Sequence, residues 1–181
     1  MSSVIISGDT SGAITLSSPA VAGTNTATLP AATGTVMVSG NMPAFSAYAS
    51  AGQSIASATV TKVIANTKEF DTNTNYDATT NYRFTPTIAG YYQINIGGWW
   101  SLSAANSYII HYIYKNGSAF KQAVSSTNLA GYGGVYLSTV LYLNGSTDYV
   151  EDYVIQYTGS AGTLLGSQAS TIFSGSLVRT A

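Results

Sequence analysis

The sequence contains no cysteine, which excludes a disulfide framework and a thiolate metal site. Charged residues make up only 7% of the 181 residues, and the formal net charge is -1. Nucleic-acid binding needs a basic stripe or patch, which this near-neutral balance does not supply. No apolar run approaches the roughly 18 residues that a membrane-spanning helix needs. These absences exclude nucleic acid and the membrane as partners.

The first residues also lack the charged and apolar regions of a secretory signal peptide. We therefore expect synthesis in the cytoplasm without Sec-type targeting. A protein made in this way can still reach the outside of a cell, because it can leave as part of a particle.

Residues typical of catalytic and metal sites are few. The only histidine, His111, lies in the aromatic run from Tyr108 to Tyr114. It has no second histidine and no carboxylate within a few residues, so neither a Ser-His-Asp arrangement nor a histidine-rich metal site is indicated. We expect His111 to be packed in the core or at an interface, and the protein not to be an enzyme.

Six of the seven acids form two clusters, which are Glu69, Asp71 and Asp77, and Asp148, Glu151 and Asp152. On composition alone, this pattern is compatible with a paired-carboxylate glycosidase. However, Glu151 and Asp152 are adjacent in a strand-like run and would face opposite sides. Asp71 and Asp77 lie in a loop rich in Thr and Asn, where polar side chains serve turns. We expect no cofactor, with a calcium ion at Asp71 and Asp77 as the alternative.

What the sequence has in abundance is apolar and aromatic residues, at 45% and 12%, including 14 tyrosines. So few charges would not keep apolar strand surfaces of separate copies apart. The composition therefore predicts that the chain associates with itself.

The stretch from Tyr82 to Ile96 organises the rest of the chain. Apolar residues fall on one parity and polar residues mostly on the other, which is the period-two pattern of half-buried strands. Ala89-Gly90 interrupts the run where a tight backbone is needed, and Pro86 lacks the amide that a central strand would use. The pattern predicts two strands, with Phe84 to Thr87 at a strand end or sheet edge.

The spacing of Phe84, Gly90, Tyr92 and Ile94 resembles the central signature of the complement component 1q globular-head family. That family shares the trimeric tumour-necrosis-factor-like jelly roll. Flanking segments fit the same family in order, from Pro43-Ala44-Phe45 through Tyr114-Lys115-Asn116-Gly117 to the last strand at residues 173–178. The resemblance implies a structural core that includes Phe45, Phe84, Gly90, Tyr92, Phe173 and Gly175.

From Phe45 onward the chain reads as short strands separated by glycine turns, with no convincing helix. The fold expected for residues 41–181 is all-β, a two-sheet jelly-roll sandwich that forms a homotrimer. In this family one sheet face is buried against two other copies, so the resemblance places tyrosines outside the core at the trimer interface. The alternative for rings exposed on loops, such as Tyr132, is stacking on a sugar ligand.

Residues 1–40 differ from the rest, because they are nearly free of aromatics and rich in Ser, Thr, Gly and Ala. Two short alternating pieces, Ala13–Leu16 and Thr26–Leu29, predict brief strands that cannot form a core alone. The segment resembles the N-terminal attachment regions of bacteriophage tail and virion-fibre proteins. We expect an extended β arm that attaches to other virion proteins.

These observations favour a non-enzymatic structural protein of a bacteriophage virion, a trimeric fibre or spike located in the virion and made in the host cytoplasm. Its jelly roll would face outward and bind a host-surface receptor or glycan. The alternatives are a capsid decoration protein of the head and a secreted bacterial binding module.

Overall fold

A computed structural model describes residues 3–21, 23–28, 31, 33–34, 36–103, 107–127 and 130–181. Contacts divide the chain into two compact units, Met1–Gly34 and Thr35–Ala181. The division falls earlier than the boundary at residue 40 expected from composition. Met37 packs against the core of the second unit, so the residues that follow Gly34 belong with the jelly roll.

The first unit contains an antiparallel hairpin of β1 (Ser3–Ser7) and β2 (Ala13–Ser17). Val4 pairs with Leu16 and Ile6 with Ile14, so four apolar side chains share one face and all are exposed. The expected strand at residues 26–29 is not present in residues 26–28, and Leu29 lies outside the described residues. A two-stranded hairpin is marginally stable by itself.

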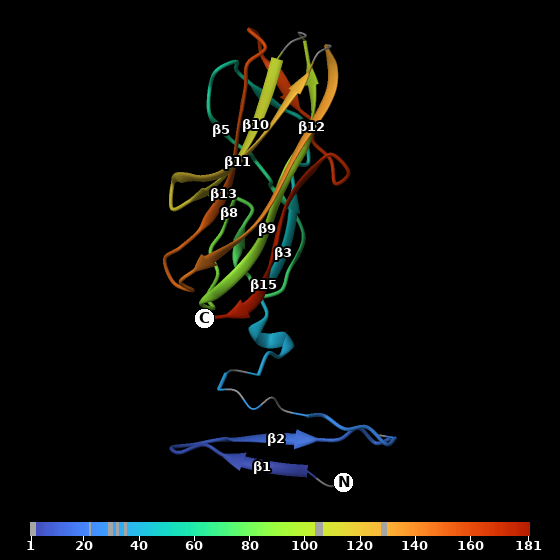
Figure 1. Ribbon diagram of the computed structural model, residues 1–181, viewed down its shortest axis with the longest axis vertical. Helices are drawn as coiled ribbons and strands as arrows, with labels where there is room; N and C mark the ends of the chain where they lie inside the picture. Colours follow the sequence, from blue (N-terminus) through green and yellow to red (C-terminus); the bar gives the residue numbers. More distant parts are fainter. Residues whose placement is uncertain are drawn as a thin grey trace. The chain divides into compact units, whose positions relative to one another are not determined.

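The second unit is a sandwich of two antiparallel sheets (Figure 1). Within the described residues, six strands form the small sheet: β5 (Thr61–Lys62), β7 (Tyr76–Asp77), β8 (Arg83–Phe84), β10 (Ser107–Lys115), β11 (Ser118–Thr127) and β13 (Val150–Gln156). Seven form the large sheet: β3 (Ala44–Tyr48), β4 (Gln53–Ile55), β6 (Thr67–Asp71), β9 (Gly90–Leu102), β12 (Gly131–Leu143), β14 (Gly162–Leu164) and β15 (Thr171–Thr180). A short 3₁₀ helix, η1 (Ser39–Asn41), precedes β3. The predicted all-β jelly-roll sandwich is confirmed.

Strand β9 lies at the centre of the large sheet, as the parity of its residues predicts. It pairs with β12 along one edge and with β15 and then β14 along the other. In Figure 1, β9 and β12 run side by side along the sandwich. β8 ends at Phe84, before Pro86, because proline cannot donate a hydrogen bond to a sheet.

The interior next to the start of β9 is aromatic. The Phe45 ring stacks on Phe84 at 4.3 Å and on Tyr76 at 5.0 Å, and meets the edge of Phe173 at 5.1 Å. Tyr92 completes the group and donates its hydroxyl to the Ile88 carbonyl at 2.7 Å. Burial raises the pKa of Tyr92 to about 12. The four aromatic residues expected in the core therefore lie in one cluster.

Gly90 and Gly175 are needed for close packing. A Cβ at Gly90 would lie 2.5 Å from the Arg179 carbonyl oxygen, and one at Gly175 would lie 2.6 Å from Ile94 Cδ1. Gly90 does not have a positive φ. Glycine is thus needed at this position because β9 and β15 pack closely together, and not because the chain turns there.

Asn116 and Gly117 form the two-residue turn between β10 and β11 that their sequence predicts. Their φ angles are 53° and 77°, which is the left-handed conformation that such hairpin turns require. Among the described residues, no helix has the length and apolar character to cross a membrane.

Candidate functional site

The outer face of the large sheet exposes an unusual number of large apolar side chains. Seven of them are between 37% and 56% exposed, and they are Tyr91, Trp99, Tyr136, Val140, Tyr142, Ile172 and Val178. Exposed apolar patches of this kind on soluble proteins mark interaction sites. We call these seven residues the apolar face.

Short uncharged side chains fill the centre of the apolar face. Ser138 Oγ donates to Asn95 Oδ1 at 2.7 Å, and Gln93 Nε2 donates to Ser138 Oγ at 2.6 Å. Asn95 Nδ2 continues the row to Ser174 Oγ at 3.3 Å. Because these polar groups already bond one another, covering them would leave few hydrogen bonds unmade.

The outer face of the small sheet carries a second, different set of rings. Tyr114 stacks on Tyr153 at 4.1 Å, Tyr112 meets Tyr114 at 6.0 Å, and Tyr108 lies 4.5 Å from Tyr157. Burial, followed by the nearby phenols of Tyr157, Tyr114 and Tyr108, raises the pKa of Tyr112. We call these five residues the tyrosine face.

The structure therefore divides the tyrosines between opposite sides of the sandwich. Tyr91, Tyr136 and Tyr142 lie on the large sheet, and the tyrosine face lies on the small sheet. One interface along one sheet can bury only one of these sets. Tyr132, the ring singled out for a ligand, follows the parity of Tyr136 in β12 and is 74% exposed.

One cation lies beside the tyrosine face, and another lies beside the ring of Tyr149, just before β13. Lys62 Nζ pairs with Glu151 Oε1 at 2.6 Å and lies 5.6 Å from the centre of the Tyr153 ring. The Arg83 guanidinium lies 4.3 Å from the centre of the Tyr149 ring. Cations beside aromatic rings are common contacts on sheet faces and add modest stability.

Asp71 and Asp77 hold turns through their carboxylates. Asp71 accepts hydrogen bonds from the backbone of Asn75 and Tyr76 and pairs with Lys68 at 3.2 Å. Asp77 accepts from the backbone N–H groups of residues 79, 80 and 81. The N–H of Thr80, then that of Thr79, holds the pKa of Asp77 well below its usual range.

A calcium ion at Asp71 and Asp77 stays a prediction. The oxygens that would coordinate the ion accept N–H groups in two separate turns. No group of three or more His, Cys, Asp or Glu side chains able to hold a metal occurs among the residues that the structure describes.

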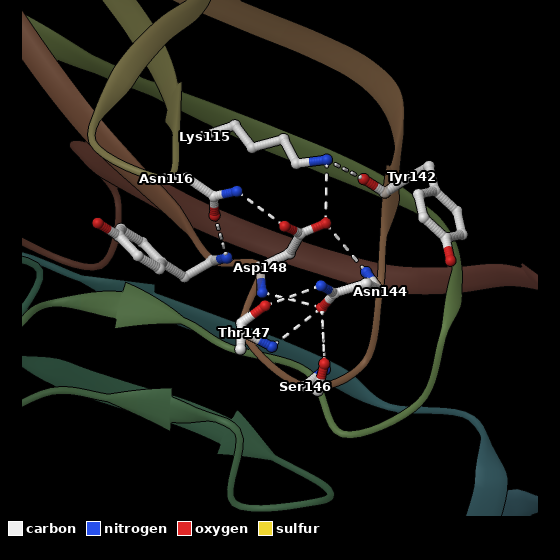
Figure 2. A network of polar contacts seen from close by, with 8 residues as sticks. Lys115, Asn116, Tyr142, Asn144, Ser146, Thr147 and Asp148 are labelled. Carbon is white, nitrogen blue, oxygen red and sulfur yellow. Dashed lines mark hydrogen bonds and ion pairs between the residues drawn. The ribbon is translucent and has the colours of Figure 1, made fainter.

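The three acids of the second cluster, Asp148, Glu151 and Asp152, each have a different partner in the fold. Figure 2 shows Asp148 between two turns, where it accepts from Asn116 Nδ2 at 2.7 Å and pairs with Lys115 at 3.0 Å. Asn144 Oδ1 accepts the backbone N–H of Asp148 at 2.9 Å. The hydrogen bond from Asn116, together with Lys115 and the Asn144 N–H, lowers the pKa of Asp148. This network joins the β10–β11 turn to the β12–β13 loop.

Asp152 lies on the opposite side of β13 from Glu151, as their adjacency in the sequence predicts, but both are buried. Asp152 Oδ1 faces His111 Nδ1 at 3.3 Å, and Trp100 Nε1 donates to His111 Nε2 at 3.1 Å. Nε2 therefore carries no proton, and the ring proton on Nδ1 faces the carboxyl group. Burial raises the pKa of Asp152.

No sequence pattern predicts this pairing, because His111 and Asp152 are brought together only when β10 pairs with β13. His111 is packed in the interior, with both ring nitrogens engaged and the side chain inaccessible. A histidine without access to substrate cannot act as a general base.

No protein-family model matches the chain, and no curated protein matches it by sequence. Solved structures do match. The globular domain of zebrafish complement 1qA has a TM-score of 0.56 and 17% identity, covering 77% of this chain and 99% of that one. Murine APRIL has a TM-score of 0.59 and 13% identity, covering 76% of this chain and 99% of the other.

The fold is a tumour-necrosis-factor-like jelly roll. Eiger TNF from S. frugiperda is also similar, with a TM-score of 0.57, 10% identity and coverage of 77% of this chain and 93% of that chain. At these identities the likeness concerns the fold of the jelly roll alone, so the site residues must be argued from this chain.

Proposed function

We propose that this protein is a non-enzymatic structural protein of a bacteriophage virion. In this proposal it is a homotrimeric fibre or spike, its N-terminal unit attaches to other virion proteins, and its jelly roll faces outward to bind a host-surface receptor or glycan. The observation that carries the proposal is the apolar face, because a soluble monomer would leave seven large apolar side chains in water.

Self-association through the apolar face is supported by what lies between its rings. The centre carries Gln93, Asn95, Ser138 and Ser174, none of which is charged. Identical copies that meet at this centre therefore bury no charge there. Arg179, whose guanidinium lies 5.2 Å from the centre of the Tyr91 ring, is a charged group beside the face. Using this face leaves the tyrosine face, on the opposite side of the sandwich, open to solvent.

The attachment role rests on the hairpin of the first unit. Its four paired apolar side chains, Val4, Ile6, Ile14 and Leu16, are between 55% and 66% exposed. Both outer edges of the hairpin are also open for strand addition within the described residues. Such a hairpin becomes stable when another protein covers it.

Light scattering on the purified protein tests the self-association. We expect a trimer at micromolar concentration, and Ser138→Asp to give a monomer, because it places a carboxylate at the centre of the apolar face. Ser126→Asp is the matched control, because Ser126 lies on the small sheet and should leave the trimer intact. A wild-type protein that stays monomeric would overturn the trimer.

Deletion of residues 1–34 tests the attachment. We expect a soluble trimer with a nearly unchanged melting temperature that no longer enters phage particles. If the truncated trimer still decorates particles, attachment lies on the jelly roll and the capsid decoration alternative is favoured. If antibody labelling of purified particles finds no full-length protein, the secreted binding module is favoured instead.

A further inference from the structure

Strand β11, at the edge of the small sheet, contains a β-bulge. Ile113 pairs with Lys121 and Tyr114 pairs with Ala119, so Phe120 is the extra residue. Bulges re-aim side chains and are frequent near binding sites. Here Lys121 Nζ lies 5.7 Å from the centre of the Phe120 ring. The bulge therefore brings an ammonium and an aromatic ring together.

A surface hollow of about 360 Å³ lies at this bulge and reaches the tyrosine face. It is lined by Tyr112, Ala119, Phe120, Lys121 and Gln122. This volume falls at the lower end of the range for small-ligand sites, which is about 300–1,000 Å³. The hollow is thus of a size suited to one sugar unit and not to a large cofactor.

The polar groups that line the hollow are free to bind a ligand. Lys62, Lys68 and Lys115 each pair with a carboxylate, whereas Lys121 has no acidic partner among the described residues. Within the described residues, the Gln122 side-chain amide and the Tyr112 hydroxyl also make no hydrogen bond. A cation, an amide and a phenol therefore converge on one hollow with their bonding capacity unused.

We propose that this hollow binds the carboxylate-bearing sugar unit of an acidic glycan. The rings of Phe120 and Tyr112 would cover the apolar face of the pyranose, Gln122 would bond its hydroxyl groups, and Lys121 would pair with its carboxylate. This assignment rests on the proposed function, because it names the host-surface ligand of the outward face.

The tyrosine face extends the site beyond one sugar. Tyr112 lines the hollow and also contacts Tyr114, which stacks on Tyr153. Further units of a polysaccharide chain can therefore rest along the row of rings. A nucleic acid does not fit this surface, since it needs several cations in a stripe and the hollow offers one.

The experiment measures binding of the full-length trimer to immobilised glycans that contain uronic or nonulosonic acids, beside the same glycans with the carboxylate methyl-esterified. We expect acidic glycans to bind at least tenfold more tightly than their esters, and binding to weaken as salt is raised. Binding that is equal for acid and ester, or absent for both, overturns the proposal.

Variants locate the site. Lys121→Gln and Phe120→Ala should each weaken acidic-glycan binding about tenfold, and Lys121→Arg should retain most of it. Lys68→Gln and Phe70→Ala are matched controls that make the same chemical changes on the large sheet, and they should bind as the wild type does. Binding that is unchanged by Lys121→Gln would place the ligand elsewhere and overturn the assignment.

Light scattering and particle labelling on the same samples keep the two proposals apart. A trimer that enters particles but binds no acidic glycan contradicts only the glycan site. A protein that binds acidic glycans but is absent from particles contradicts the virion role and leaves the site intact.

Discussion

The interior of the jelly roll has two halves of different character. One buried cluster contains Phe45, Tyr76, Phe84, Tyr92 and Phe173 with aliphatic neighbours, and we call it the aromatic half. The other cluster is built around Trp100 and includes Ile55, Ile109 and Leu164. Three buried polar residues lie among its side chains: His111, Asp152 and Gln156. We call this second cluster, with its polar residues, the polar half.

The two halves hold the sheets together in different ways. In the aromatic half the main contribution is apolar area removed from water, which does not depend strongly on direction. In the polar half, one hydrogen bond links Trp100 on β9 to His111 on β10, and a second links His111 to Asp152 on β13. Such directional bonds select one alignment of three strands, and removing one partner leaves buried groups unpaired.

The largest effect is expected in the aromatic half. Phe173→Ala should lower the free energy of unfolding by about 3–5 kcal/mol, because it leaves a cavity against the packed rings of Phe45 and Tyr76. Such a loss is comparable with the whole stability of many domains, so insoluble protein is expected. Denaturant unfolding checks this, with Phe70→Ala as control because Phe70 is 51% exposed. A soluble Phe173→Ala protein of normal stability would show that the aromatic half contributes little.

A smaller effect is expected in the polar half. His111→Ala should lower the free energy of unfolding by about 2–3 kcal/mol in total, at the low end of the cost of about 1–3 kcal/mol for each buried group left unpaired. The groups concerned are Trp100 Nε1–H and the Asp152 carboxyl. Indole fluorescence should shift as Trp100 loses its acceptor. If His111→Ala is as stable as the wild type at equal protein concentration, the polar half does not depend on these bonds.

The smallest effect is a difference in pH dependence between two aspartates close in sequence. Burial raises the pKa of Asp152 in the folded protein. As the pH rises above about 3.9, Asp152 therefore ionises in the unfolded chain while it is still protonated in the folded one, which favours unfolding. The wild type should lose stability over this range relative to Asp152→Asn, which has no such group. Asn116 and Lys115 lower the pKa of Asp148, so the wild type loses stability relative to Asp148→Asn as the pH falls. Thermal unfolding between about pH 3 and pH 7 compares them, and slopes of the same sign would contradict the assignment.

The fold was predictable because its signals are local. Parity placed Tyr92, Ile94 and Ile96 on the buried side of β9, and Asn116-Gly117 marked a hairpin turn. The resemblance at Phe84, Gly90 and Tyr92 supplied the jelly roll, which the structure confirms. In the first unit, small polar residues give weaker signals, and the strand expected near residue 26 is absent from residues 26–28.

The candidate sites were less predictable because they depend on partners distant in sequence. Parity shows that Glu151 and Asp152 face opposite sides of their strand. It does not show that Glu151 pairs with Lys62 or that Asp152 contacts His111. The tyrosines could be counted, yet their division between two opposite faces follows from strand order. The bulge at Phe120 could not be predicted, because no glycine or proline marks it in the sequence.

The position of β15 in the large sheet has a consequence for how the protein is made. This strand, the last along the chain, pairs with β3 on one side and with β9 on the other. Until the ribosome has released β15, β3 and β9 have no strand between them, and Phe45 lacks the neighbouring ring of Phe173. The large sheet therefore cannot be completed until β15 has left the ribosome, and nascent chains that lack this strand need protection from aggregation until then.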